Sequence, residues 1–182
     1  MNDVLHFFKG EEELFPQLHA LANQAYITSG IVKPIDKVLD QRLEVRDSAS
    51  SELQRIRGSI GTVRRDISKN FEKVLRKLKR DGYLAATNEA YINDRRVLSV
   101  VSSHKRQVAG NVVGNSKSGS FTYIEPQENM GLNNELEMLL DDERTEIRRI
   151  FLALTNEIRQ LLPLIETYQS AVSYTHLTLP TT

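Results

Sequence analysis

The 182-residue chain contains no cysteine and no long apolar run. The lack of cysteine excludes disulfides, thiolate zinc sites and cysteine nucleophiles, and is compatible with a reducing cytoplasm. No apolar run approaches about 18 residues, so no membrane span is expected. No charged-then-apolar leader opens the chain, so no secretory signal is expected either. The sequence therefore predicts a cytoplasmic protein of one domain or one and a half.

Apolar residues recur every three or four positions in two long stretches, 51–82 and about 125–168, which is typical of amphipathic helices. The second stretch has one polar interruption, Glu143. At about 1.5 Å per residue each helix would be about 45 to 60 Å long, too long for an ordinary globular core. The two stripes are therefore predicted to pack against each other as an antiparallel pair. They comprise Leu53, Ile56, Ile60, Val63, Ile67, Phe71, Val74 and Leu78, and Leu132, Leu136, Leu139, Ile147, Ile150, Leu154, Ile158, Leu161 and Ile165.

Between the helices, Tyr91–Ile124 is rich in β-forming residues and predicts three or four short antiparallel strands. The strands are expected near 97–101, 107–113 and 121–124, with turns at Asn93-Asp94 and Gly114–Gly119. The second turn resembles a phosphate loop, but no lysine follows Gly119 and a strand follows where a helix would be required. We interpret it as a hairpin turn.

Charge is distributed unevenly along a chain whose net charge is zero. Residues 51–82 hold ten basic and four acidic side chains, whereas 125–157 hold nine acidic and three basic ones. A basic helix is typical of a phosphate-binding surface. The same pattern also arises from charge complementarity between two paired helices, so both interpretations stay open.

The insert is basic as well, and its cations are the candidate nucleic-acid-binding residues. They are expected to lie away from the acidic helix. Reversing Arg95, Arg96, Lys105 and Arg106 to Glu is therefore expected to abolish binding without unfolding the arm. Tyr91, Phe121 and Tyr123 are candidates for base stacking or for the core. The candidate cations are Arg95, Arg96, Lys105, Arg106 and Lys117.

No arrangement of residues predicts catalysis or metal binding. The four histidines, His6, His19, His104 and His176, are scattered and none has a second ligand at helical spacing. One helix face is interpreted as solvated, with ordinary i,i+3 pairs; its acidic residues are Asp141, Asp142, Glu143 and Glu146. The segment is predicted to have no enzymatic activity and no cofactor of its own.

Six blocks of residues carry a family resemblance: Val45–Leu53, Arg95–Leu98 with Val100, Gly110 with Val112, Ser116–Gly119, Tyr123–Pro126 and Leu132–Leu136. In this order they resemble the bacterial MutS2 subfamily of the MutS mismatch-repair ATPases. The resemblance runs from about Val38 to Ile158. Leu43 stands where a glycine is usual, Ser51 and Ser99 replace prolines, and Val113-Gly114 replaces a frequent His-Asp pair.

The resemblance implies a segment of a dimeric, cytoplasmic, DNA-dependent ATPase and endonuclease that uses ATP and Mg. It implies a parent that binds branched or mismatched DNA and suppresses recombination, or one that contacts ribosomal RNA on stalled ribosomes. The alternative is a structural coiled-coil module for dimerisation or protein interaction.

The predicted fold class is α+β, mainly α: a helical base plus a long antiparallel helix pair, the lever, carrying a small antiparallel β clamp. The predicted divisions are a helical core segment (1–50), the first lever helix (51–85), the clamp insert (86–125), the second lever helix (126–170) and a non-native or disordered tail (171–182).

Overall fold

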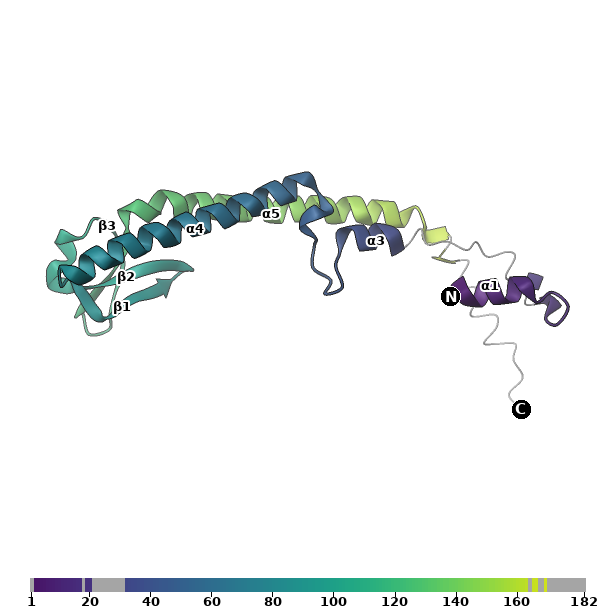
Figure 1. Cartoon of the computed structure of the whole chain (residues 1–182), viewed down its shortest axis with the longest axis horizontal. Helices are drawn as coiled ribbons and strands as arrows, with labels where there is room; N and C mark the ends of the chain where they lie inside the picture. The colour runs from purple at the N-terminus through teal and green to yellow at the C-terminus, as the bar shows by residue number, and fades with distance from the viewer. Residues whose placement is uncertain (1, 18, 21–31, 164, 167–168, 170–182) are drawn as a thin grey trace, which may run out of the picture. The chain divides into compact units, whose positions relative to one another are not determined.

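The computed structural model describes residues 2–17, 19–20, 32–163, 165–166 and 169 (Figure 1). The chain divides into two compact units, Ser51–Glu146 and Met1–Ser50 with Ile147–Thr182. The tail predicted over 171–182 and part of the helical core segment predicted over 1–50 lie outside the described residues. The fold class is α+β and mainly helical, as the sequence predicts.

Two long helices, α4 (Ser51–Arg80) and α5 (Gln127–Arg159), account for the two apolar stripes. Along α4 the stripe is buried at Leu53, Ile56, Ile60, Val63, Phe71 and Leu78. Within the unit Ser51–Glu146 the helices run antiparallel. Asn129 Nδ2 donates to the Ile67 carbonyl over 3.2 Å, while Arg57 Nε lies 2.6 Å from Glu143 Oε1 further along the pair. Glu143 therefore interrupts the apolar pattern because it pairs with Arg57.

A glycine-capped turn ends α4 where the chain enters the sheet. Gly82 adopts a φ of 73°, the Tyr83 amide donates to the Leu78 carbonyl, and the Gly82 amide donates to the Lys79 carbonyl. This pair of hydrogen bonds is the Schellman arrangement, which favours glycine at the left-handed position. Tyr83 then packs against the core cluster that contains Leu78. The cap thus fixes the direction in which the first strand leaves the helix.

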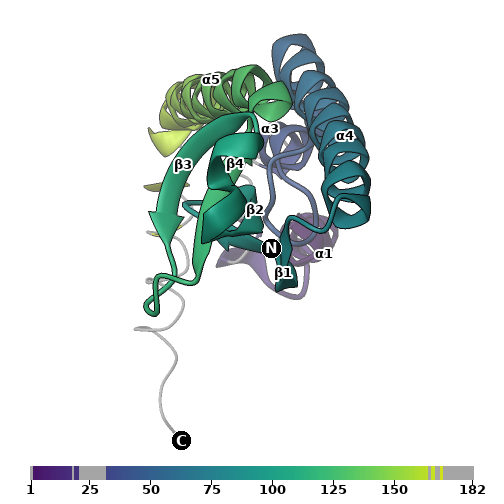
Figure 2. The same cartoon turned by 90° about the vertical axis from the view of Figure 1, so that its left-hand side faces the viewer.

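The insert is a four-stranded antiparallel sheet with the order β1-β2-β4-β3. Its strands are β1 (Leu84–Ile92), β2 (Arg95–Val101), β3 (Gly110–Asn115) and β4 (Phe121–Pro126). Asn93 and Asp94 both have positive φ and join β1 to β2, as the two-residue hairpin turn predicts. The 3₁₀ helix η2 (Ser102–Gln107) connects β2 to β3. Strand β4 lies between these two strands in the sheet. Figure 2 shows the strands beside α4 and α5.

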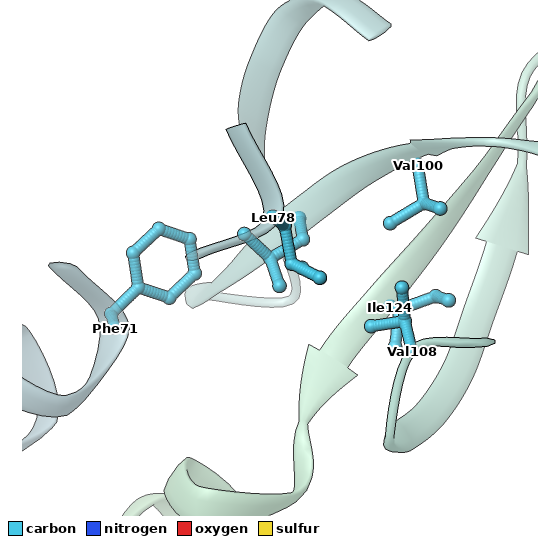
Figure 3. Packing of buried hydrophobic residues seen from close by; sticks show 6 residues of the cluster. Phe71, Leu78, Val100, Val108 and Ile124 are labelled. Carbon is cyan, nitrogen blue, oxygen red and sulfur yellow. The ribbon is translucent and has the colours of Figure 1, made fainter. Parts of the chain in front are cut away.

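The core joins α4 to one face of the sheet. Leu98, Val100 and Ile124 share that face because Leu98 is paired with Ile124 across β2 and β4. They pack with Phe71 and Leu78 of α4 and with Val108, as Figure 3 shows for the labelled members. Val97 and Ser99, on the opposite face of β2, are buried too. The central strand β2 is therefore covered on both sides.

Two strand predictions need correction. β1 (Leu84–Ile92) precedes all three of the strands that were expected by position, because its alanines, Asn88 and Glu89 are weak strand formers that adopt extended structure through pairing with β2. The strand expected over 107–113 begins only at Gly110. Gln107 ends η2, and Val108 turns into the core instead.

The other unit contains α1 (Asn2–Gly10) and α3 (Val32–Val38), and the 3₁₀ turn η1 (Asp47–Ala49) precedes α4. Within the predicted helical core segment, α3 ends at Val38. Asp40 Oδ1 accepts the amides of Arg42 and Glu44, over 2.8 and 3.0 Å, and such local hydrogen bonds compete with helix continuation. A bridge between Leu39 and Val45 closes the resulting loop.

Leu43 adopts a φ of 64° in this loop. This left-handed conformation favours glycine, since a Cβ there costs about 1 to 2 kcal/mol. We expect Leu43→Gly to raise the free energy of unfolding by about 1 kcal/mol, after allowance for the flexibility of glycine in the unfolded chain. Denaturant unfolding checks this, with Leu43→Ala as the matched control. Because alanine keeps the Cβ, an equal gain in that variant would contradict the explanation.

Among the described helices, none combines the length and the apolar character that crossing a membrane requires.

Candidate nucleic-acid interface

Arg95 and Arg96 are neighbours at the start of β2, immediately after the Asn93-Asp94 turn. Successive side chains of a strand point to opposite faces of the sheet. The two guanidinium groups therefore leave β2 in opposite directions and meet different helices.

Arg95 connects the sheet to α5. Its Nη1 lies 3.0 Å from Glu125 Oε1, and its Nη2 donates to Asn134 and Glu137 of α5 over 3.0 and 2.9 Å. Glu125 is 2 % exposed and also accepts from Asn133 Nδ2 over 2.7 Å. Partial burial lowers the pKa of Arg95, but the hydrogen bonds with Glu125 and Glu137 outweigh it and hold the pKa above its ordinary value.

Arg96 connects the sheet to α4. Its guanidinium lies 4.1 Å from the centroid of the Phe71 ring, and its Nη2 lies 2.7 Å from Glu72 Oε1. Glu89 of β1 pairs with the same guanidinium. Burial lowers the pKa of Arg96, but hydrogen bonds with Glu89 and Glu72 outweigh it and raise the pKa overall. The ring contact and two carboxylates hold this side chain on the face of α4.

These contacts correct three of the expectations from the sequence. First, Arg95 does not lie away from the acidic helix, because it pairs with Glu137 of α5. A reversal to Glu at Arg95 or Arg96 would also place a carboxylate beside the acids that these residues neutralise, so it would weaken the sheet as well as change any surface charge. Glu143 and Glu146 are likewise not part of a solvated face, since Glu143 pairs with Arg57 and Glu146 is 7 % exposed.

The other three predicted cations, Lys105, Arg106 and Lys117, are exposed and are called the tip cations below. Lys105 and Arg106 lie on η2, and Lys117 lies in the turn between β3 and β4. Ser102, at the start of η2, ties the two segments together. Its amide donates to the Ser120 carbonyl over 3.0 Å, and its hydroxyl donates to the Gly119 carbonyl over 2.7 Å. In the part of the chain that the structure describes, the tip cations form no ion pair with an acid.

A stacked pair of rings also holds η2 in place. Tyr83 and His104 lie with ring centroids 4.9 Å apart and planes 20° apart, and His104 Nδ1 lies 3.2 Å from Gln107 Oε1. Sequence reasoning missed this contact because no local pattern relates residues 21 positions apart. Among the aromatic candidates for stacking, Tyr91 is 71 % exposed while Phe121 and Tyr123 are half-buried.

Within the described residues, no group of three or more His, Asp or Glu side chains is placed to hold a metal ion. A hairpin turn joins β3 to β4, as predicted, but it covers residues 116–120, because Gly114 and Asn115 of the expected turn belong to β3. In this turn the Ser116 amide donates to the Phe121 carbonyl, and the Ser116 hydroxyl accepts from the Phe121 amide. The hydroxyl groups of Ser116 and Ser118 are also hydrogen-bonded to each other.

The unit Ser51–Glu146 thus defines a class of helical-arm proteins, in which an antiparallel helix pair carries a small antiparallel sheet as an insert. The chain is homologous to a segment of the bacterial MutS2 proteins, as the resemblance in the sequence indicated. It is 34 % identical over 161 residues to endonuclease MutS2 of Lactococcus lactis subsp. cremoris, covering 86 % of this chain and 20 % of the relative.

Two further relatives show similar coverage. Endonuclease MutS2 of Aquifex aeolicus is 32 % identical over 156 residues, covering 85 % of this chain and 20 % of the relative. The putative endonuclease MutS2 of Bacillus subtilis is 32 % identical over 142 residues, covering 78 % of this chain and 18 % of the relative. The chain therefore spans about one fifth of the length of these curated relatives. No protein-family model matches the chain.

Proposed function

We propose that this chain is the lever and clamp of a MutS2-type protein and that the tip cations contact the phosphates of a nucleic acid. The relatives carry the name endonuclease MutS2. By this proposal the whole protein is a cytoplasmic, homodimeric, DNA-dependent ATPase and endonuclease that suppresses recombination. Its ATP and Mg sites and its nuclease then lie in parts of the protein beyond this segment.

One observation carries the proposal: the tip cations are exposed and without an acidic partner in the described residues, while Arg95 and Arg96 are paired with carboxylates. A cation that has no internal partner is available to replace the counterions of a phosphate backbone. The hydrogen bonds of Ser102 and the Tyr83–His104 stack hold the segments that carry these cations. The backbone segments that carry the tip cations are therefore held in place before binding.

Arg95 and Arg96, the other two predicted contacts, have a different role in this proposal. Each fixes the sheet to one lever helix, so that a force on the tip is transmitted to both α4 and α5. They support nucleic-acid binding by positioning the clamp.

The tip variant Lys105→Gln/Arg106→Gln/Lys117→Gln tests the proposal by fluorescence anisotropy of the full chain over a salt series. On duplex DNA, log K decreases linearly with log salt, and each lost phosphate contact makes this negative slope shallower by about 0.9. The magnitude of the slope should therefore be smaller by about 3 in the tip variant. The ligands are branched DNA, duplex DNA and structured RNA of equal length. The control variant Arg64→Gln/Arg144→Gln/Arg148→Gln removes three exposed charges elsewhere and should leave the slope unchanged.

An equal fall in slope in the tip and control variants would overturn the assignment to the tip. Preference for structured RNA over both DNA ligands would favour the ribosomal alternative. Absence of binding by the folded chain at low salt would favour a structural module.

A further inference from the structure

Five basic residues of α4 lie on one narrow face of the helix, called the α4 stripe: Arg65, Lys69, Lys73, Arg76 and Arg80. At 3.6 residues per turn they fall within an arc of about 80°. This arc lies opposite the face that buries Ile60, Val63 and Phe71. All five side chains are exposed.

The stripe points away from α5. Asn129 of α5 reaches the Ile67 carbonyl, and Ile67 lies on the buried side of α4. The acidic residues of α5 in the same unit therefore do not neutralise the stripe. Charge complementarity between the helices accounts for Arg57 and Glu143, but it does not account for these five cations.

Acidic side chains are absent from the arc itself, and one acid lies beside each of its edges. Glu72 is turned to Arg96 on the sheet, and Asp66 is exposed and forms no ion pair with the stripe in the described residues. Local contacts hold two of the guanidinium groups along the helix: Arg65 donates to Thr62 over 2.9 Å, and Arg76 donates to the Glu72 carbonyl over 3.2 Å. Arg80 lies 3.7 Å from Asp81 at the end of the helix. Lys69 and Lys73, in the middle, form no ion pair in the described part of the chain.

Spacing and polarity favour a nucleic-acid backbone as the occupant. With a rise of about 1.5 Å per residue, the stripe is about 22 Å long and its cations are about 4.5 to 6 Å apart along the axis. One strand of a duplex presents a phosphate every 3.4 Å or so, about six over this length. The arc contains no apolar side chain that would enter a lipid bilayer, as an interfacial helix requires.

We infer that the α4 stripe is a second phosphate-binding surface, along which a nucleic-acid backbone follows the lever in addition to its contact with the tip. The inference deepens the proposed function and rests on it for the class of partner. Binding then occupies a length of nucleic acid set by the helix, and it requires no particular base sequence because only phosphates are touched.

The stripe variant Lys69→Gln/Lys73→Gln/Arg76→Gln tests this inference beside the tip and control variants, each of which loses three positive charges. We expect the salt slope on duplex DNA to fall by about 3 in the stripe variant and to stay unchanged in the control. Glutamine is nearly as good a helix former as lysine and arginine, so circular dichroism should show unchanged helix content.

The outcomes separate the two proposals. A fall in slope in the stripe variant alone supports the stripe and contradicts the tip, whereas a fall in the tip variant alone overturns the stripe. Absence of binding by the unaltered chain overturns both. Two further probes check other occupants: vesicles rich in phosphatidylserine, and analytical ultracentrifugation for salt-sensitive self-association. The inference would also be overturned if the unaltered chain bound vesicles or itself but no nucleic acid, and the stripe variant lost that binding.

Discussion

Replacing Arg95 by alanine is expected to lower the free energy of unfolding of the clamp by about 3 kcal/mol. The loss arises because the Glu125 carboxylate is buried and Arg95 is its cationic partner, and a buried charge without its partner typically costs about 3 to 5 kcal/mol. Asn133 still donates to Glu125, which places the expected value at the lower end. Denaturant unfolding measures the loss, and amide hydrogen exchange should place it in β2 and β4.

Two companion variants test the physical reason. Glu137→Gln removes the other carboxylate that Arg95 contacts, but that side chain is 76 % exposed, so the change should stay below about 1 kcal/mol. In a Glu125→Gln background, Arg95→Ala should cost much less, because a neutral amide leaves no charge buried. An undiminished loss in that background would show that Arg95 acts through packing.

Gly110→Ala is expected to destabilise the sheet by about 3 kcal/mol as well. A Cβ at this position would overlap the Glu125 carbonyl oxygen and lie 2.8 Å from Ile124 Cγ2. Gly110 is paired with Pro126 at the end of β4, and it has a φ of 155°, which residues with a side chain rarely adopt. Either β3 separates from β4 or the backbone strains, and both responses should lower the midpoint of denaturant unfolding.

Gly114→Ala, in the same strand, is the matched control. The nearest atom to a Cβ there is Tyr123 Cδ2 at 3.8 Å, an ordinary contact. Stability should be unchanged or rise by about 0.5 kcal/mol, since alanine loses less entropy on folding. An equal loss at both glycines would contradict the steric explanation.

The tip and stripe proposals differ in how binding would act on the lever helices. Binding at the tip acts on a sheet that Arg95 fixes to α5 and Arg96 fixes to α4, whereas binding along the stripe acts on α4 alone. The two surfaces would therefore report nucleic acid to the rest of a MutS2-type protein in different ways.

The sequence by itself determined the two long helices, the turn at Asn93-Asp94, the existence of a hairpin turn before β4, and the relation to MutS2 proteins. These features depend on periodicity and on local backbone preferences, which a single stretch of chain contains. It also identified the basic character of the insert and of the first helix. It left open whether those charges serve a partner or the neighbouring helix.

The tertiary structure alone decided which cations are paired. Arg95 meets Glu125 and Glu137, 30 and 42 residues further along the chain, and Arg96 meets Glu72, 24 residues before it. It also decided that β1 is a strand and that the α4 stripe faces away from α5. Such contacts depend on which faces come together in space, and neither composition nor spacing along the chain specifies the partner of a charge.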